Sequence, residues 1–547
     1  MKKNKSKLNR FSVVGALVVV VLTTTGFASG FFEITKQLEI FNTLFKELSL
    51  NYVDETTPAT LMDKAINGML EGLDPYTVFY NEQEVGEARI NSGGALALIG
   101  AELRRYNDRW LVAKVDQDGA ADKAGLRPGD ELAQINGLDI DPNLDQIEPL
   151  LNGSPGSLLT LSYLRLGARG EALLTREKTV KSSVAFSGLA TPKIGYIAVT
   201  EFSAKTSADT KRALYVLKEQ GAESLILDLR GNPGGLLSEA VNMVGLFVPK
   251  GTLVTYTQSV VAEYNVSFTT TTNPVDLEIP IVVLINGRSA SASEIVSGAL
   301  QDLDRGVVVG GRSFGKGLVQ RPKKLSYGTQ FKVTISRYYT PSGRCIQALD
   351  YWNRDENGDP VKTLPKNYNA FQTKGGRTVY DGGGVLPDVV LPSSDFSPIT
   401  TALLKTPVVL DFGADFYARN DISSWENFAF SNSHYQGFVG FVAAHQASIE
   451  TQTEALLGGV LKMAQTEALW DKISPEMVVL EQQIQKAKEA LLQDKKEEIQ
   501  ALVVDDLLLR YFYTDGLYRY KLKNNPEVLE AVDLLSHPKK YAKILQP

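Results

Sequence analysis

Histidine and cysteine are scarce in this sequence of 547 residues, which contains three histidines and one cysteine. The single cysteine, Cys345, cannot form an intramolecular disulfide, so the chain is not a disulfide-stapled scaffold. The histidines His434, His445 and His537 lie late and far apart, which leaves no His/Cys cluster for a metal ion. We therefore expect neither a metal nor another cofactor.

The sequence also has no excess of basic over acidic residues. Lysine and arginine number 57 against 63 aspartates and glutamates, and the net charge is −6, so no nucleic-acid partner is expected. One acidic stretch, NRDENGDPVKTL at 353–364, resembles a calcium loop. It begins with Asn353 and has Leu364 where the bidentate glutamate of such a loop belongs, which favours a polar turn instead.

The first 32 residues have the layout of an export signal. A basic start, MKKNKSKLNR, precedes the apolar stretch FSVVGALVVVVLTTTGFASGFF. The segment predicts either a signal peptide cleaved near Ala28 or a retained single-span membrane anchor whose positive end stays in the cytoplasm. Under both alternatives, the rest of the chain is exported.

The remaining chain divides by pattern into four regions. Residues 33–84 show helical spacing, residues 85–168 show short alternating strands with glycine turns, and residues 169–394 alternate buried strands with helices. Continuous apolar strands such as SLILDL and IPIVVLI indicate a layered α/β core with a largely parallel sheet. Residues 395–547 predict a helical C-terminal domain, which could serve as a dimer interface or as a brace.

The region 85–168 contains GAADKAGLRPGDELAQINGLDI, which resembles the core of a PDZ domain. Domains of this family bind an extended C-terminal peptide as an added strand, with backbone N–H groups holding its carboxylate. The resemblance places the carboxylate-binding loop at Ile99, Gly100 and Ala101. The alternative is a PDZ fold that only packs against its neighbour.

The α/β region contains a serine-rich helix start, LINGRSASASEIVSGALQD at 284–302. A helix N-terminus suits a nucleophilic serine, because its free N–H groups stabilise an oxyanion. Since this region has no histidine, a Ser-His-Asp arrangement is excluded and a lysine is the remaining base. The ordinary lysine pKa of about 10.4 would have to fall by several units through burial and nearby positive dipoles.

The stretch GRSFGKGLVQRP at 311–322 supplies such a lysine. Lys316 lies between two glycines, and in an extended segment Lys316 and Gln320 would point to one face. Gln320 could then orient the amine without stabilising its charged form. A third stretch, LDLRGNPGG at 227–235, ends a buried strand in a glycine-rich turn, so Gly234 and Gly235, together with Ala292, are the expected oxyanion donors.

These stretches, with RYYTPSGRCIQ, resemble the carboxyl-terminal processing proteases, the tail-specific S41-type serine endopeptidases with a Ser–Lys dyad; the resemblance covers roughly residues 35–395. It implies an α/β multidomain fold: a PDZ domain, a crotonase/ClpP-like layered protease core, and helical N- and C-terminal regions. By motif position, it makes Ser291 the nucleophile, Lys316 the general base and Gln320 its partner.

The resemblance also implies partners and a location. Protein substrates with exposed C-terminal tails would bind without any cofactor, and the chain would form a homo-oligomer, a dimer through its helical regions, with an adaptor protein as a further partner. The expected location is the bacterial periplasm, in association with the inner membrane.

Two rival hypotheses differ in chemistry. Ser313 and Lys316 match the SxxK spacing of penicillin-binding enzymes, but that pair must lie one helical turn apart and this glycine-rich segment is a poor helix. The other rival is a non-catalytic PDZ scaffold, which predicts a broken dyad, whereas every element of the dyad is present here.

Overall fold

A computed structural model describes residues 32–82, 84–85, 97–141, 144, 146–178, 182–392, 396–445 and 449–546. The chain forms two compact units, residues 1–79 and residues 80–547, and each is described by itself. In the first unit, residues 32–51 are helical and α2 (Pro58–Glu71) follows, beginning at a proline and ending before Gly72. The predicted signal or anchor at 1–32 falls almost entirely outside the described residues, and none of the described helices is long and apolar enough to span a membrane.

The predicted PDZ region forms an antiparallel sheet in the order β3-β4-β5-β7-β8. Its strands are β3 (Ala101–Tyr106), β4 (Arg109–Val115), β5 (Glu131–Ile135), β7 (Leu158–Arg165) and β8 (Ala168–Thr175). Two short helices, α4 (Ala120–Lys123) and α5 (Glu148–Leu151), accompany it. The boundary predicted at 168 falls where β8 begins. The sheet continues beyond it, because β8 pairs with β7 along its whole length.

The α/β core is built on a six-stranded sheet in the order β10-β11-β12-β15-β16-β23. The strands are β10 (Val184–Thr191), β11 (Ile194–Val199), β12 (Ser224–Asp228), β15 (Ile281–Ile285), β16 (Val307–Gly310) and β23 (Val389–Val390). All neighbours except β10 and β11 are parallel. Every residue of β12 and β15 is buried, as expected for strands covered on both faces.

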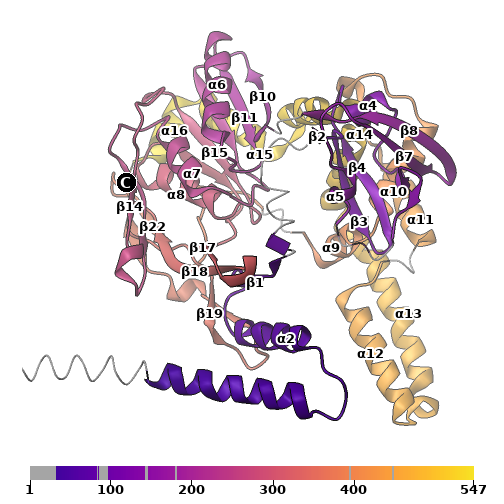
Figure 1. The fold of residues 1–547 in the computed structure, drawn as a ribbon. Coiled ribbons are helices and arrows are strands. Elements are labelled where there is room, and N and C mark those ends of the chain that lie inside the picture. Colours follow the sequence, from indigo (N-terminus) through magenta and orange to yellow (C-terminus); the bar gives the residue numbers. More distant parts are fainter. Residues whose placement is uncertain are drawn as a thin grey trace, which may run out of the picture. The chain divides into compact units, whose positions relative to one another are not determined.

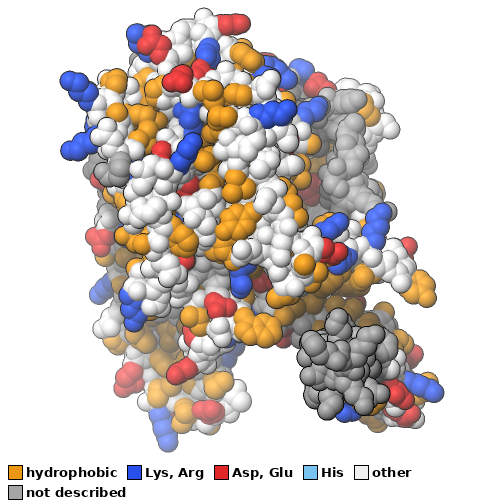
Figure 2. Space-filling model, turned by 90° about the vertical axis from the view of Figure 1, so that its left-hand side faces the viewer, with side chains coloured by type: hydrophobic (Ala, Val, Ile, Leu, Met, Phe, Trp, Pro, Cys, Tyr) orange, Lys and Arg blue, Asp and Glu red, His pale blue; other side chains and the backbone are white. Residues whose placement is uncertain are grey.

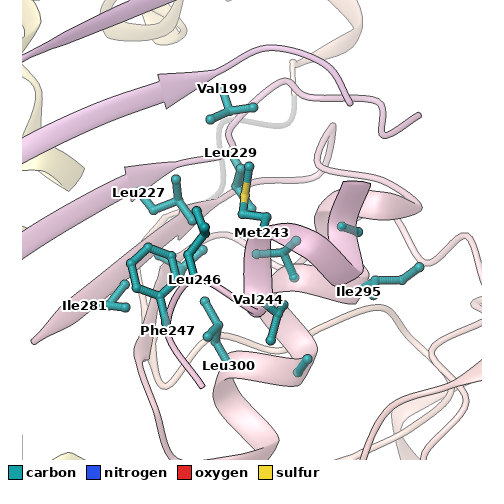
Figure 3. Packing of buried hydrophobic residues seen from close by; sticks show 14 of the residues in the cluster. Val199, Leu227, Leu229, Met243, Val244, Leu246, Phe247, Ile281, Ile295 and Leu300 are labelled. Carbon is teal, nitrogen blue, oxygen red and sulfur yellow. The ribbon is translucent and has the colours of Figure 1, made fainter. Parts of the chain in front are cut away.

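Helices from two distant parts of the chain cover the two faces of this sheet (Figure 1). On one face lie α6 (Thr206–Glu219), α7 (Leu237–Val244) and α8 (Ala292–Asp302), and Figure 3 shows Met243 of α7 beside Leu229. On the other face, α15 (Pro526–Ser536) and α16 (Pro538–Ile544) bury Val528, Leu534 and Tyr541 against Ile226 and Leu284. The helices α15 and α16, which lie in the region predicted to be helical, thus pack on the sheet of the α/β core.

A second, antiparallel sheet contains β14 (Ser267–Thr269), β13 (Leu253–Gln258), β18 (Gln330–Tyr339) and β17 (Leu318–Lys324) in that order. The following hairpin joins β19 (Leu349–Arg354) to β20 (Pro360–Lys362), and its turn is the stretch that resembles a calcium loop. Asp355 Oδ1 accepts the backbone N–H groups of Asn357 and Asp359. This carboxylate therefore stabilises a polar turn.

The helices between residues 398 and 524 lie around a core of their own, rich in aromatic residues, to which all but the helix 452–466 contribute. They are α9 (Pro398–Leu404), α10 (Val408–Arg419), α11 (Asn432–Ala444), α12 (Gln452–Thr466), α13 (Trp470–Asp494) and α14 (Lys496–Asn524). Phe412 contacts Phe416, Phe438 and Phe441 in tilted or edge-on arrangements. On the face shown in Figure 2, acidic and basic side chains are interspersed, in keeping with the nearly balanced composition.

Helix α14 also contacts the PDZ region. The guanidinium of Arg510, which is 4% exposed, donates to the carbonyl oxygens of Pro128 and Leu410 (3.0 Å) and to Asp506 Oδ2 (3.2 Å). Burial raises the pKa of the Asp506 carboxyl, and the charge of Arg510 opposes this rise. Arg510 therefore both joins the PDZ region to the helical domain and neutralises a buried acid.

We expect Arg510→Ala to lower the free energy of unfolding by about 3–5 kcal/mol, because it leaves Asp506 buried without its counter-ion. Arg519→Ala is the matched control, since Arg519 pairs with Asp515 at the same spacing but on an exposed face, where such pairs contribute at most about 1 kcal/mol. Urea denaturation followed by tryptophan fluorescence measures both. Equal losses in the two variants would contradict this role of Arg510.

Candidate active site

The predicted nucleophile lies between the end of β15 and the start of α8. The neighbouring serines of the SASAS stretch are fully buried, and their hydroxyls donate to backbone carbonyls: Ser289 to Leu229 (2.8 Å) and Ser293 to Asn232 (3.0 Å). Ser291 is partly exposed and is the N-cap residue of α8. Of the three, Ser291 is therefore the serine whose side chain can meet a substrate.

Ser291 has backbone angles φ 56° and ψ −113°. A positive φ is uncommon for a residue with a side chain, and it persists only where the surrounding contacts enforce it. Those contacts include the hydrogen bond from the Ser291 N–H to Glu294 Oε2 (2.7 Å) and the one from the Tyr338 hydroxyl to the Ser291 carbonyl (3.3 Å). The strained conformation places Ser291 at the end of the loop that joins β15 to α8.

Glu294, in the first turn of α8, is fully buried and joins two of the predicted stretches. Its Oε1 accepts the Ser313 hydroxyl (2.6 Å) and the Gly315 N–H (2.7 Å). Its Oε2 accepts the Ser291 N–H (2.7 Å) and the Lys316 N–H (2.9 Å). One carboxylate oxygen therefore holds the backbones of Ser291 and Lys316 within two hydrogen-bond lengths of each other.

Burial raises the pKa of the Glu294 carboxyl, and the four hydrogen bonds that it accepts partly offset this rise. A carboxylate has about four acceptor sites, so this environment suits its ionised form. The sequence predictions did not include Glu294. The spacing Ser291-x-x-Glu294 is, however, that of a capping box, which would have signalled the contact between Ser291 and Glu294 but not the contact with Lys316.

The segment that carries Lys316 is irregular from 312 to 317. Its glycines allow close backbone approach: Gly315 has φ +88°, and a Cβ there would lie 2.4 Å from the Cβ of Ala348. Lys316 is partly buried. Ser313 and Lys316 do not lie on a helical turn, and the Ser313 hydroxyl is engaged by Glu294, so the SxxK arrangement lacks its geometry here.

Gln320 lies in β17, two residues after the strand begins. A β-bulge between Val319 and Gln320 interrupts the simple alternation on which its orientation was predicted. The Gln320 amide donates to Thr334 Oγ1 on β18 (3.2 Å). Its predicted contact with the Lys316 amine stays a prediction.

The glycine-rich turn after β12 reaches the serine directly. A Cβ on Gly234, which has φ +103°, would lie 2.8 Å from Ser291 Cβ and 2.9 Å from Ala292 N. Gly234 therefore keeps open the space in front of the first N–H of α8. The N–H of Gly234, one of the three predicted oxyanion donors, already donates to Asn232 Oδ1 (2.9 Å).

Gly235 is required for a second close approach. Its φ is +142°, and a Cβ would lie 2.2 Å from the carbonyl oxygen of Phe202, with which it forms a parallel bridge. Asn232, which was not predicted, fixes this turn: it is fully buried and its amide also donates to the carbonyl of Val199 (2.9 Å). The turn, the serine and the lysine segment thus meet at one place.

The residues predicted to bind a peptide line a groove between β3 and α5. Ile99, Gly100 and Ala101 border a cavity of about 250 Å³ together with Glu148 and Leu151. Gly100 has φ +70°, and a Cβ there would lie 3.3 Å from the Cα of Gly119, so the loop packs closely on the start of α4. Among the described residues, no group of His, Cys, Asp and Glu is arranged to hold a metal ion.

Three family models match the chain. The model of peptidase family S41 matches residues 193–350, a PDZ domain model matches residues 97–175, and the model "Probable PDZ-protease, C-terminal helical domain" matches residues 399–535.

The carboxy-terminal-processing protease of Bartonella bacilliformis is 33% identical over 355 residues, which are 63% of this chain and 80% of that protein. The carboxy-terminal processing protease CtpA of Bacillus subtilis is 29% identical over 353 residues, 62% of this chain and 75% of that protein. Among solved structures, the photosystem II D1 C-terminal processing protease is 26% identical, covering 68% of this chain and 96% of that chain with a TM-score of 0.35. The chain therefore belongs to peptidase family S41 and is a C-terminal processing serine protease with a PDZ domain and a C-terminal helical domain.

Proposed function

We propose that this protease is an endopeptidase that cleaves peptide bonds with Ser291 as nucleophile and Lys316 as general base. The neutral Lys316 amine takes the hydroxyl proton as Ser291 Oγ bonds to the scissile carbonyl carbon. The C–N bond then breaks, and the leaving amine receives that proton. Water hydrolyses the resulting acyl-enzyme by the same proton transfers, which frees Ser291. Gln320 orients the Lys316 amine.

The observation that carries this proposal is the shared hydrogen-bond acceptor Glu294 Oε2, which joins the N–H groups of Ser291 and Lys316. The two residues lie in different segments of the chain, with α8 and β16 between them in the sequence. For the tetrahedral oxyanion, the N–H groups of Ala292 and Gly235 are the donors we favour, because the Gly234 N–H donates to Asn232.

The PDZ groove is the proposed recognition site for substrate tails. An extended C-terminal peptide would add to β3, with its carboxylate at the N–H groups of Ile99, Gly100 and Ala101 and its last side chain in the adjoining cavity. The partly apolar lining, with Ile99, Leu103 and Leu151, fits an apolar C-terminal residue.

The basic and apolar N-terminal sequence supports export to the bacterial periplasm, with inner-membrane association through a single-span anchor or release after cleavage. We further propose a homo-oligomer, a dimer through the helical regions, and delivery of substrates by an adaptor protein. The exposed side chains of Leu456, Val460 and Met463 on one face of α12 support such an association.

Ser291→Ala and Lys316→Ala should each lower kcat by a factor on the order of 10⁶, because dyad members act as a unit. Lys316→Arg should be equally inactive, since arginine keeps the positive charge but cannot release its proton. Cleavage of an unfolded protein with an apolar C-terminus, followed by mass spectrometry, measures turnover.

The Ser291→Ala form should also retain substrate tails, so sequencing the captured ends identifies the preference of the groove. Equal survival of the substrate with the wild type and with Ser291→Ala would support a non-catalytic scaffold instead. Loss of turnover only in Ser313→Ala would support the SxxK pair.

Gly234→Ala should lower kcat by about 10²- to 10³-fold, the usual cost of disturbing an oxyanion site. The added Cβ would fall between Ser291 Cβ, Ala290 O and Ala292 N. Gly231→Ala is the control, because Gly231 also has a positive φ in the same turn but would place its Cβ in open space. Steady-state kinetics with both variants should separate the effect of the close approach from that of backbone strain. Equal kcat values in the two variants would contradict a role for the close approach at Gly234.

Glu294→Gln should lower kcat by about 10²-fold, because an amide offers one acceptor oxygen where a carboxylate offers two. Glu239→Gln is the matched control: Glu239 is also buried and accepts the N–H and the hydroxyl of Ser207 on α6, and it lies on α7 rather than on the segments of Ser291 and Lys316. Both variants should lose stability, by about 1–3 kcal/mol, and only Glu294→Gln should lose turnover of the folded enzyme. Normal kcat in folded Glu294→Gln would refute the positioning role.

A further inference from the structure

The glycine-rich turn beside Ser291 is anchored at its start by Arg230, whose contacts reach the end of the chain. Its guanidinium Nε and Nη2 donate to the Asp228 carboxylate (2.9 Å and 2.5 Å). Its Nη1 donates to Asn525 Oδ1 (2.7 Å) and to Glu527 Oε2 (2.5 Å). Arg230 is therefore held by two carboxylates from segments almost 300 residues apart in the sequence.

This cluster is largely shielded from water. The side chains of Arg230, Asp228 and Glu527 are 12%, 7% and 14% exposed. The Tyr196 hydroxyl donates to Asp228, and the ring of Tyr518 packs on that of Tyr196. Burial raises the pKa of Asp228, but the charge and hydrogen bonds of Arg230 outweigh this effect, so the net shift is downward. Ion pairs in such surroundings are strong and geometrically specific, especially the two-pronged contacts of arginine.

The backbone leads from Arg230 straight into the turn at the serine. The Gly231 N–H donates to Asn286 Oδ1 (3.0 Å), and Asn232 contacts Val199 and Gly234. Gly234 follows four residues after Arg230 and lies against Ser291. Arg230 therefore begins a short, hydrogen-bonded segment that ends at the turn beside Ser291.

We propose that Asn525 and Glu527, at the start of α15, are positioning residues for the oxyanion turn and act through Arg230. This inference rests on the proposed role of Ser291 and of the turn. The C-terminal segment is then part of the catalytic unit, because it closes one face of the sheet and also sets the turn that stabilises the transition state.

The two residues offer variants that separate positioning from folding. Glu527→Ala removes one acceptor of Arg230 Nη1, whereas Glu527→Gln keeps an acceptor oxygen and removes only the charge. Asn525 also caps α15 by accepting the Val528 N–H (3.1 Å). Asn525→Ser keeps a capping hydroxyl but is too short to reach Arg230. Glu530→Ala is the matched control, because Glu530 lies on the same helix and pairs with Lys540 instead.

We expect Glu527→Ala and Asn525→Ser each to lower kcat about 10-fold with KM within about twofold of the wild-type value, and the double variant to lower kcat about 100-fold. Glu527→Gln should stay within about threefold of the wild type and Glu530→Ala should match it. Steady-state cleavage of a protein substrate measures kcat and KM, and the reaction rate of Ser291 with a fluorophosphonate should fall in parallel with kcat.

Several outcomes would overturn the proposal. It would be overturned by normal kcat values in folded Glu527→Ala and Asn525→Ser. It would also be overturned by a raised KM with unchanged kcat, or by activity that only follows the folded fraction in thermal melts. If Glu527→Ala does not fold, Asn525→Ser decides, since it retains the helix cap. The Ser291→Ala variant tests the proposed function separately, because turnover by that variant would refute Ser291 as the nucleophile. An inactive Ser291→Ala together with normal kcat in the Glu527 and Asn525 variants would refute only the positioning role.

Discussion

A carboxylate without access to water organises the centre of this protein. Glu294 accepts four hydrogen bonds, and its two oxygens gather the start of α8, the Ser313 hydroxyl and the backbone of the lysine segment. Such a group is costly to bury unless every lone pair is used, and this requirement makes the arrangement specific. The strained backbone of Ser291 persists because Glu294 and Tyr338 hold it on both sides.

The three-layer core supplies the rigidity that this arrangement needs. Buried parallel strands present β12 and β15 side by side, and the turns that follow them carry the glycines and the serine. Carboxyl ends of neighbouring parallel strands meet at one edge of a sheet, where α/β proteins commonly place their sites. Here the covering layer on one face comes from α15 and α16, so these helices stabilise the sheet that leads to Ser291.

Helix α14 links the regions of the larger unit. Arg510 and Tyr513 contact Pro128 and Asp122 in the PDZ domain, and the helix ends one residue before Asn525, which contacts Arg230. The helical domain therefore contacts both the PDZ domain and the α/β core. Within one chain its aromatic core and buried ion pairs brace these two domains, and the dimer interface stays a proposal.

Much of the architecture follows from local pattern. Alternating and continuous apolar runs sufficed to predict the strands of the PDZ domain, the parallel α/β core and the C-terminal helices. They sufficed because the spacing of apolar residues within a short segment differs between strands and helices. The absence of histidine from the α/β region, together with the serine-rich helix start and the glycine-flanked lysine, led to the prediction of a serine–lysine pair. Glycine spacing pointed to the turn at Gly234 and to the segment around Lys316, because close approach and positive φ require glycine.

Other features depend on contacts between residues far apart in sequence. No local pattern shows that Glu294 reaches the Lys316 backbone, that a bulge alters the setting of Gln320, or that Asn232 occupies the Gly234 N–H. Nor does it show that Glu527 meets Arg230. The sequence by itself determined the element types, the candidate nucleophile and base, and the family. Only the tertiary structure decided how these groups are held, because a buried hydrogen bond depends on where packing brings its two partners.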